Sequence, residues 1–257
     1  GASGSSAGPG SATSAGLVGF SIGSETWGSI VSPSTRNGVT GLRPSFGTVS
    51  RSGAMALSWT MDKLGPMTRS VEGAAIIFET IRGSDNLDRT VRDVPFIYPS
   101  KRGLKNLRIG YIASAFVDSS VSENDKASLD VLKSMGLNLI PIELPKFPTQ
   151  ALSFVLQAEA AAAFDELTRS NKDDQLVRQV KSAWPNVFRE ARFIPAVEYI
   201  NANRARTLLN QKMSELMEKI DVYIIPSFYG DNLLRTNLTG HPCVVVPNGF
   251  NKKGRPT

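Results

Sequence analysis

From residue 70 onward, the spacing of apolar residues predicts alternating helices and strands. The expected elements of this stretch are a helix over 70–82, a strand over 107–113, a helix over 122–135 and a strand over 137–142. Ser70 is the candidate N-cap of the first helix, and Gly136 would end the second. A strand, a helix and a further strand in this order are typical of an α/β unit.

The second half of the chain is predicted to be mostly helical. Within residues 149–218, the stretches 158–167 and 196–220 carry apolar residues at helical spacing. Two short apolar runs, 221–226 and 243–246, predict buried strands, and a proline stops each of them. The pattern of the whole chain therefore favours an α/β fold.

Residues 1–53 are rich in glycine and serine and carry few charges. A flexible linker is one interpretation of such a composition. Two segments oppose it: the apolar run 17–22 predicts a buried strand or helix end, and residues 38–44 mix apolar with turn-forming residues. Small residues in this region are then expected to let backbones approach each other or a ligand closely.

Charge and cysteine usage narrow the classes of function. The net charge is +6, but the basic residues are scattered, and the densest cluster is Lys101, Arg102, Lys105 and Arg108. We interpret this cluster as solvated surface, because a nucleic-acid interface needs basic residues gathered on one face. No run reaches the roughly 18 to 20 apolar residues of a membrane helix, so no membrane span is predicted.

Cys243 and His241 are the only residues of their types. A single cysteine cannot form an internal disulfide, which fits a reducing compartment. The compartment itself is left open, with the cytoplasm only as the default. Cys243 lies in an apolar run and is predicted to be a buried, inert thiol. A lone histidine excludes a metal site built from several His or Cys ligands, so no metal is expected and His241 is assigned a structural role.

Two glycine-rich segments near the start of the chain each contain a candidate catalytic serine. Residues 1–8 contain Ser5 and Ser6, and residues 23–30 contain Ser29, which follows Ser5 by 24 residues. Three further short motifs follow along the chain, at residues 38–47, 61–71 and 237–247. Together these segments resemble the amidase-signature family of serine hydrolases, most strongly over residues 1–82.

The resemblance implies a catalytic mechanism. It identifies Ser29 as the nucleophile and Ser5 as a proton relay that follows a cis Gly4–Ser5 bond. A neutral lysine upstream of Ser5 would be the base, because a serine hydroxyl needs one. The family's oxyanion hole corresponds to the backbone amides of Thr26, Trp27 and Gly28. The resemblance implies no cofactor.

Other positions of these motifs carry expectations too. Ser6 is expected to hydrogen-bond within its own loop, and Glu25, where the family usually has Asp, to accept hydrogen bonds behind the site. Trp27 replaces a small residue and would limit the size of the acyl group, and Val31 stands where many members carry Arg. Lys63 is interpreted as a surface charge. The sequon Asn237-Leu238-Thr239 is interpreted as a chance match.

The fold implied is one α/β domain in which a large mixed sheet is covered by helices on both faces. Residues 1–257 would be part of this catalytic domain, truncated at both ends, and inactive alone because no lysine lies in a matching motif. The expected substrate is a small-molecule amide, and the oligomeric state is left open. The alternatives are the glutaminase component of a glutamine-dependent Asp/Glu-tRNA amidotransferase, which Trp27 and Val31 disfavour, and an inactive family member.

Overall fold

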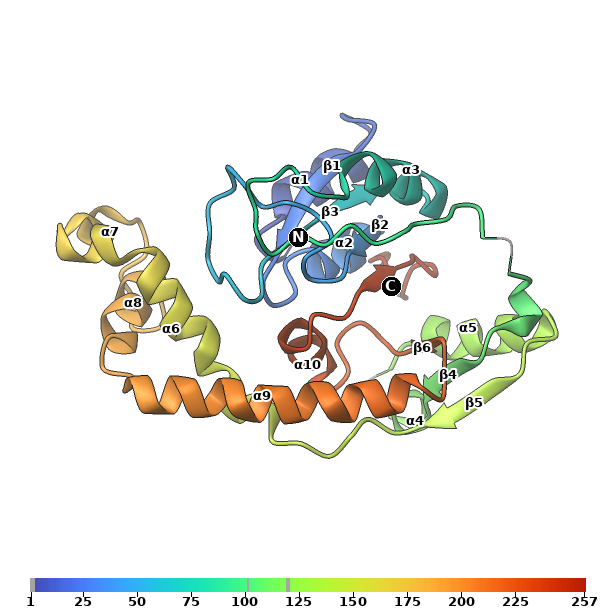
Figure 1. Cartoon of the computed structure of the whole chain (residues 1–257). Helices are drawn as coiled ribbons and strands as arrows, with labels where there is room; N and C mark the ends of the chain where they lie inside the picture. The colour runs from blue at the N-terminus through green and yellow to red at the C-terminus, as the bar shows by residue number, and fades with distance from the viewer. Residues whose placement is uncertain (1–2, 101, 119–120) are drawn as a thin grey trace.

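The structure is a computed structural model that describes residues 3–100, 102–118 and 121–257. Lys101, part of the predicted basic cluster, and the motif residues Gly1 and Ala2 lie outside the described residues. Figure 1 shows the amino-terminal third as one layered unit, with a second sheet and its helices beside it and the long helix α9 running along one side of the molecule. In the described part, no helix is long and apolar enough to cross a membrane.

The first sheet is antiparallel and contains the motif segments. Its strands lie in the order β1 (Ser21–Glu25), β3 (Lys63–Thr68), β2 (Thr40–Arg43) and β7 (Cys243–Val245). Helices α1 (Ala7–Ser14), α2 (Val31–Asn37) and α3 (Val71–Ile81) pack against it. The carboxyl-terminal strand β7 thus completes a sheet that the amino-terminal third begins.

The second sheet is parallel, with strands in the order β5 (Leu139–Ile142), β4 (Ile109–Ile112) and β6 (Val222–Ile224). Helices α4 (Ala113–Val117) and α5 (Glu123–Ser134) belong to this unit, and a short 3-10 helix, Leu104–Asn106, precedes β4. The predicted α/β class is confirmed. Where one large sheet was expected, the described strands form two sheets, and α10 (Asn232–Leu238) lies in the chain between β6 of the second sheet and β7 of the first.

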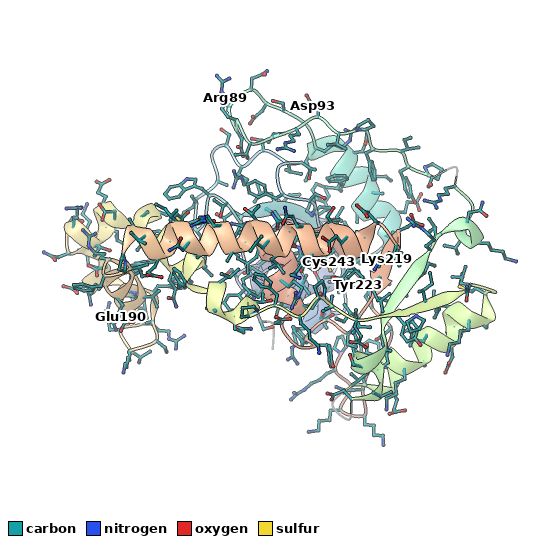
Figure 2. The ribbon with its side chains drawn as sticks, turned by 60° about the horizontal axis from the view of Figure 1, so that its bottom comes forward. Arg89, Asp93, Glu190, Lys219, Tyr223 and Cys243 are labelled. Atoms are coloured by element: carbon teal, nitrogen blue, oxygen red, sulfur yellow. The ribbon has the colours of Figure 1, made fainter. Side chains whose placement is uncertain are left out.

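The helices between residues 149 and 217 form the helical half of the chain. They are a 3-10 helix at Thr149–Leu152, α6 (Phe154–Ala163), α7 (Asp165–Arg169), a 3-10 helix at Lys172–Gln175, α8 (Trp184–Ala191) and α9 (Ala196–Met217). Figure 2 shows Glu190 of α8 at one end of α9 and Lys219, just beyond its other end. The predicted helix over 158–167 is broken at Phe164, whose ring stacks on Phe188 with centroids 4.9 Å apart.

Local signals explain why the predicted elements begin and end where they do. The Ser70 side chain accepts a hydrogen bond from the Gly73 amide at 3.0 Å and caps α3, as expected. Ser122 and Asp125 form a capping box at the start of α5. Gly136 follows that helix with a positive φ of 76°, which a glycine adopts at little cost.

One expectation for the opening of the chain is wrong. Residues 17–22 do not form a buried element: Leu17 is 78% exposed and Phe20 46% exposed, and β1 begins only at Ser21. The glycine- and serine-rich segment 7–14 is a helix, although its composition gives no apolar stripe. The linker interpretation is excluded, because the opening supplies two helices and two strands to the packed unit.

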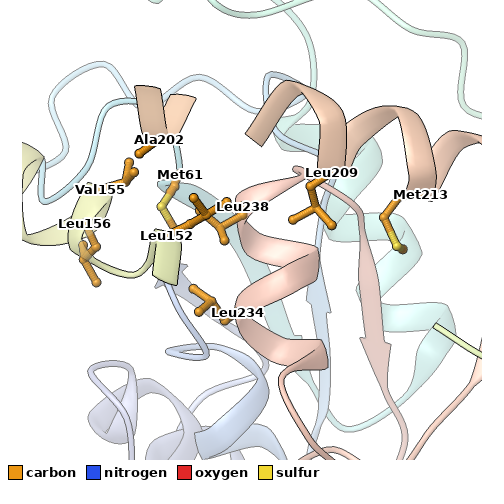
Figure 3. Close-up of a cluster of buried hydrophobic side chains, with 9 residues drawn as sticks. All are labelled: Met61, Leu152, Val155, Leu156, Ala202, Leu209, Met213, Leu234 and Leu238. Atoms are coloured by element: carbon orange, nitrogen blue, oxygen red, sulfur yellow. The ribbon is translucent and has the colours of Figure 1, made fainter. Parts of the chain in front are cut away.

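One apolar cluster joins α6, α9 and α10 to the loop before β3 (Figure 3). Its buried members are Met61, Leu152, Val155, Leu156, Ala202, Leu209, Met213, Leu234 and Leu238. These residues come from segments that are far apart in the sequence. The cluster therefore fixes the helical half of the chain against the unit that holds the serines.

Leu209→Ala tests this cluster. Leu209 is fully buried in α9, whereas its neighbour Leu208 is 54% exposed. Because truncation leaves a cavity, Leu209→Ala should lower the free energy of unfolding by about 2–5 kcal/mol. Leu208→Ala, the matched control, should change it by less than about 0.5 kcal/mol. Equal losses in the two variants, measured by urea unfolding, would contradict this packing.

Candidate active site

The structure brings Ser5 and Ser29 into contact. Ser5 precedes α1, and Ser29 lies in the turn between β1 and α2. The Ser29 hydroxyl donates to the Ser5 Oγ atom at 3.3 Å, and the Ser6 amide donates to the Ser29 carbonyl at 3.3 Å. Ser5 is exposed and Ser29 half-buried, so both hydroxyls lie at the surface of the unit. The contact is longer than the usual 2.7–2.8 Å or so for two hydroxyls, and catalytic hydrogen bonds often shorten only in the substrate complex.

Ser6 joins the serine loop to the first sheet. Its buried hydroxyl donates to the Ser24 carbonyl and accepts from the Ser24 amide, both at 3.1 Å. The expectation that Ser6 bonds within its own loop is therefore wrong, because strand β1 offers the paired donor and acceptor. An added Cβ at Gly23 would lie 3.0 Å from this hydroxyl, so the neighbouring glycine makes room for the contact.

The expected cis bond before Ser5 is not found. Among the described residues, the only cis peptide joins Tyr98 to Pro99, so the Gly4–Ser5 bond is trans. The trans form is the lower in energy for a non-proline residue, and a cis bond requires surrounding contacts to hold it. In this trans conformation Gly4 has a positive φ of 81°, and Ser5 still reaches Ser29.

The turn before Ser29 offers backbone donors. Among the residues that the structure describes, none accepts a hydrogen bond from the amides of Trp27, Gly28 or Ser29. Gly28 has a φ of 95°, and a Cβ there would lie 2.7 Å from the Leu233 side chain, so α10 packs directly on this turn. The side chain of Thr26, at the base of the turn, is buried. Backbone amides without an acceptor are the kind of donor that an oxyanion hole uses.

A buried carboxylate lies behind the turn, as expected for Glu25. Its Oε2 atom accepts from the amides of Ile30 and Val31, each at 2.8 Å. Its Oε1 atom accepts from Arg43 and from the Asn237 side chain, each at 2.7 Å. Burial alone would raise the pKa of Glu25, but the Arg43 guanidinium and these hydrogen bonds hold the pKa below its usual value. Glu25 is therefore a carboxylate that organises its surroundings.

Arg43 and Asn237 are structural residues that the sequence reasoning did not single out. Arg43 is fully buried and also donates to the His241 carbonyl at 3.0 Å. Asn237 has no exposed surface, so its position in a glycosylation sequon is without consequence. The sequence signal for Arg43 was a charged residue at the end of the otherwise uncharged strand β2. The signal for both residues was that a buried Glu25 would need hydrogen-bond donors.

Lys63 is not the surface charge that was expected. Its side chain is buried beside Glu25 across the β1–β3 pair, and its amine donates to the Met61 carbonyl rather than to either serine. Burial, together with repulsion from Arg43, lowers the pKa of Lys63 to about 7. The surface interpretation was wrong because charged residues that are remote in sequence, Glu25 on β1 and Arg43 on β2, lie near the buried amine.

Four further positions can now be placed. Trp27 is 37% exposed and Val31 is buried at the start of α2; the expected limit on acyl size stays a prediction. The His241 ring shares a hydrogen bond of 2.7 Å with the Thr239 hydroxyl, and burial lowers its pKa, as fits the structural role expected of it. Burial raises the pKa of the Cys243 thiol, which makes it less reactive.

A pair of contacting serines, free turn amides and a buried carboxylate behind them form the arrangement expected of a serine hydrolase. The sequence profile of the amidase family matches residues 2–241. The chain belongs to this family, the amidase-signature enzymes, and has their fold.

Proteins from several organisms are similar to this chain. The A component of glutamyl-tRNA(Gln) amidotransferase from Prochlorococcus marinus subsp. pastoris is 30% identical over 301 residues, covering 98% of this chain and 62% of that protein. The peptide amidase of Stenotrophomonas maltophilia superposes with a TM-score of 0.76 at 25% identity, covering 98% of this chain and 60% of that one. The corresponding amidotransferase component of Thermotoga maritima gives 0.74 at 26% identity, with 98% and 60% coverage. The chain thus spans about three fifths of the length of these relatives.

Lys63→Met tests the buried amine through pH. The unfolded chain keeps the Lys63 proton up to pH 10.5, whereas the folded protein releases it near pH 7. Because the unfolded state binds more protons in this window, the free energy of unfolding should rise with pH, by up to about 1.4 kcal/mol per unit. Below pH 7 both states are charged, and the full cost of burying the charge is present.

In Lys63→Met this rise should vanish. The difference in free energy of unfolding between variant and wild type should favour the variant at pH 6 and shrink towards pH 10. Cys243 and Tyr223, whose pKa values burial raises, act in the opposite direction at high pH but do so in both proteins. A difference that stays constant from pH 6 to pH 10 in urea unfolding would show that Lys63 is not a buried, titrating amine.

Proposed function

We propose that the protein carrying this chain hydrolyses amide bonds through an acyl-enzyme formed on Ser29. The observation that carries the proposal is the 3.3 Å contact between the Ser29 and Ser5 hydroxyls, in a chain of the amidase family. Ser29 would add to the amide carbonyl while its proton passes to Ser5 and the Ser5 proton passes to a base. Ser5 would then protonate the leaving amine or ammonia and regain its proton from the base, and water would release the acyl group by the reverse relay.

The turn would stabilise the charge that develops on the carbonyl oxygen. The proposed donors are the amides of Thr26, Trp27 and Gly28, of which the last two have no acceptor among the described residues. Backbone donors fixed before the reaction begins need no reorganisation in the transition state, and the loss of one such donor commonly costs roughly 10²- to 10³-fold in kcat. The buried Glu25 would hold this turn against α2.

The proposed reaction also needs a base that accepts the proton from the serine pair. The Lys63 amine hydrogen-bonds to Met61, and the His241 ring to Thr239, so neither is engaged with the serines. By resemblance to the family, we assign the base to a lysine that precedes Ser5 in the whole protein. We further propose that residues 1–257 form part of one catalytic domain and that the chain alone has no amidase activity.

Two substrate classes are supported by different observations. The similarity to a peptide amidase and the bulky Trp27 favour an amidase acting on a carboxamide. The similarity to amidotransferase components favours glutamine hydrolysis in a complex with partner proteins. We place the carboxamide first, because Trp27 and the buried Val31 add no polar group for the charged ends of an amino acid.

Ser29→Ala in the full-length protein tests the mechanism. Removing the nucleophile should lower kcat for ammonia release by roughly 10⁴- to 10⁶-fold. Ser32→Ala is the matched control, since it removes a hydroxyl from the same region that pairs with Ser3 at 2.5 Å. A panel of small carboxamides alongside glutamine separates the two substrate classes. Turnover by Ser29→Ala at the rate of Ser32→Ala would refute Ser29 as nucleophile.

A further inference from the structure

Thr26 is held from outside its own turn. Its hydroxyl donates to the Asp62 carboxylate at 2.5 Å, and the Thr26 side chain is 7% exposed. Thr26 follows the last residue of β1, and Asp62 precedes the first residue of β3. Because Glu25 lies opposite Lys63 in the antiparallel pair, the contact between Thr26 and Asp62 continues that pairing by one step. It therefore lies where the two strands end and the turn to Ser29 begins.

The Asp62 carboxylate is itself fixed. Its second oxygen accepts from the amides of Leu57 and Ser58 at 2.8 and 2.9 Å, and its own amide donates to the Ser58 carbonyl at 2.9 Å. Both carboxylate oxygens thus have donors, so the side chain has little freedom to turn. Hydrogen bonds to a charged carboxylate are stronger than those between neutral groups.

A buried carboxylate, Glu159, anchors the loop that carries Asp62. Glu159 of α6 accepts from the Ser58 hydroxyl at 2.5 Å, from the Thr60 hydroxyl at 2.7 Å and from Tyr199 of α9 at 2.7 Å. Glu159 is 4% exposed and belongs to the helical half of the chain. The loop 57–62 is therefore held between the helices and the turn that precedes Ser29.

We propose that Asp62 is a positioning residue that sets the backbone of the turn 26–29 through the Thr26 hydroxyl. Glu25 holds the far side of the turn at the Ile30 and Val31 amides, and Asp62 holds its near side. Because both sides of the turn are fixed, the backbone amides of Trp27 and Gly28 between them are held in one orientation. This inference rests on the proposed function, and it assigns to Asp62 a role in the rate of the chemical step without contact to substrate.

Thr26→Val removes the hydroxyl while keeping the shape of the side chain. In the full-length protein it should lower kcat by roughly 10- to 100-fold and leave KM within about twofold, because small displacements of catalytic donors cost this much. Thr26→Ser, which restores a hydroxyl, should recover most of the kcat that Thr26→Val loses. Ser50→Ala is the matched control, since it deletes an equally short hydroxyl–carboxylate bond, to Asp85, at an exposed position.

Asp62→Ala completes a double-mutant cycle. If Asp62 acts through Thr26, the Thr26→Val change should have little further effect on kcat in the Asp62→Ala background. Should Asp62→Ala fail to fold, the comparison of Val and Ser at position 26 still decides the question. An unchanged kcat in folded Thr26→Val, a loss confined to KM, or no recovery with Ser would each overturn the inference. A protein in which Ser29 is essential but Thr26→Val is fully active would refute this role of Asp62 while leaving the proposed function intact.

Discussion

The buried carboxylate of Glu25 is the interaction on which the rest of this structure depends. It accepts four hydrogen bonds, two from the backbone at the start of α2, one from Arg43 on β2 and one from Asn237 on α10. Neither Glu25 nor Arg43 has any exposed side-chain surface. Two buried charges are costly to desolvate, and removing one partner typically costs about 3–5 kcal/mol because the other is left unpaired. Such a pair is tolerated only where several segments of the chain supply its remaining partners.

This constraint couples the two ends of the chain. Asn237, the His241 carbonyl and strand β7 all come from the last third of the sequence, yet they complete the surroundings of a pair that the first third contributes. Leu233 of α10 also packs on Gly28 of the turn. The position of Ser29 is therefore set by distant segments as well as by its own loop, and the apolar cluster around α9 supports the helices that hold these segments in place.

The sequence predicted the features that depend on residues close together in the chain, and it missed those that depend on distant partners. Helices α3 and α5 and strands β4 and β5 were predicted because their caps and periodicity lie within the element. The contact between Ser5 and Ser29 was predicted from the resemblance to the amidase-signature family. The burial of Lys63 and the roles of Arg43 and Asn237 were not, because the cost of burying a polar group depends on partners from remote strands and helices. Helix α1 was missed because small residues give no amphipathic stripe.

The central claim is that the Glu25 carboxylate holds the turn before Ser29, the proposed nucleophile, in the geometry that the proposed reaction needs. Its most direct test is the rate at which a serine-directed fluorophosphonate labels the full-length protein, with the modified residue identified by mass spectrometry. We expect labelling of wild type at Ser29, much slower labelling of folded Glu25→Gln, and a wild-type rate for Glu79→Gln, which alters only an exposed ion pair with Arg82. Labelling of Glu25→Gln at Ser29 at the wild-type rate would contradict the account.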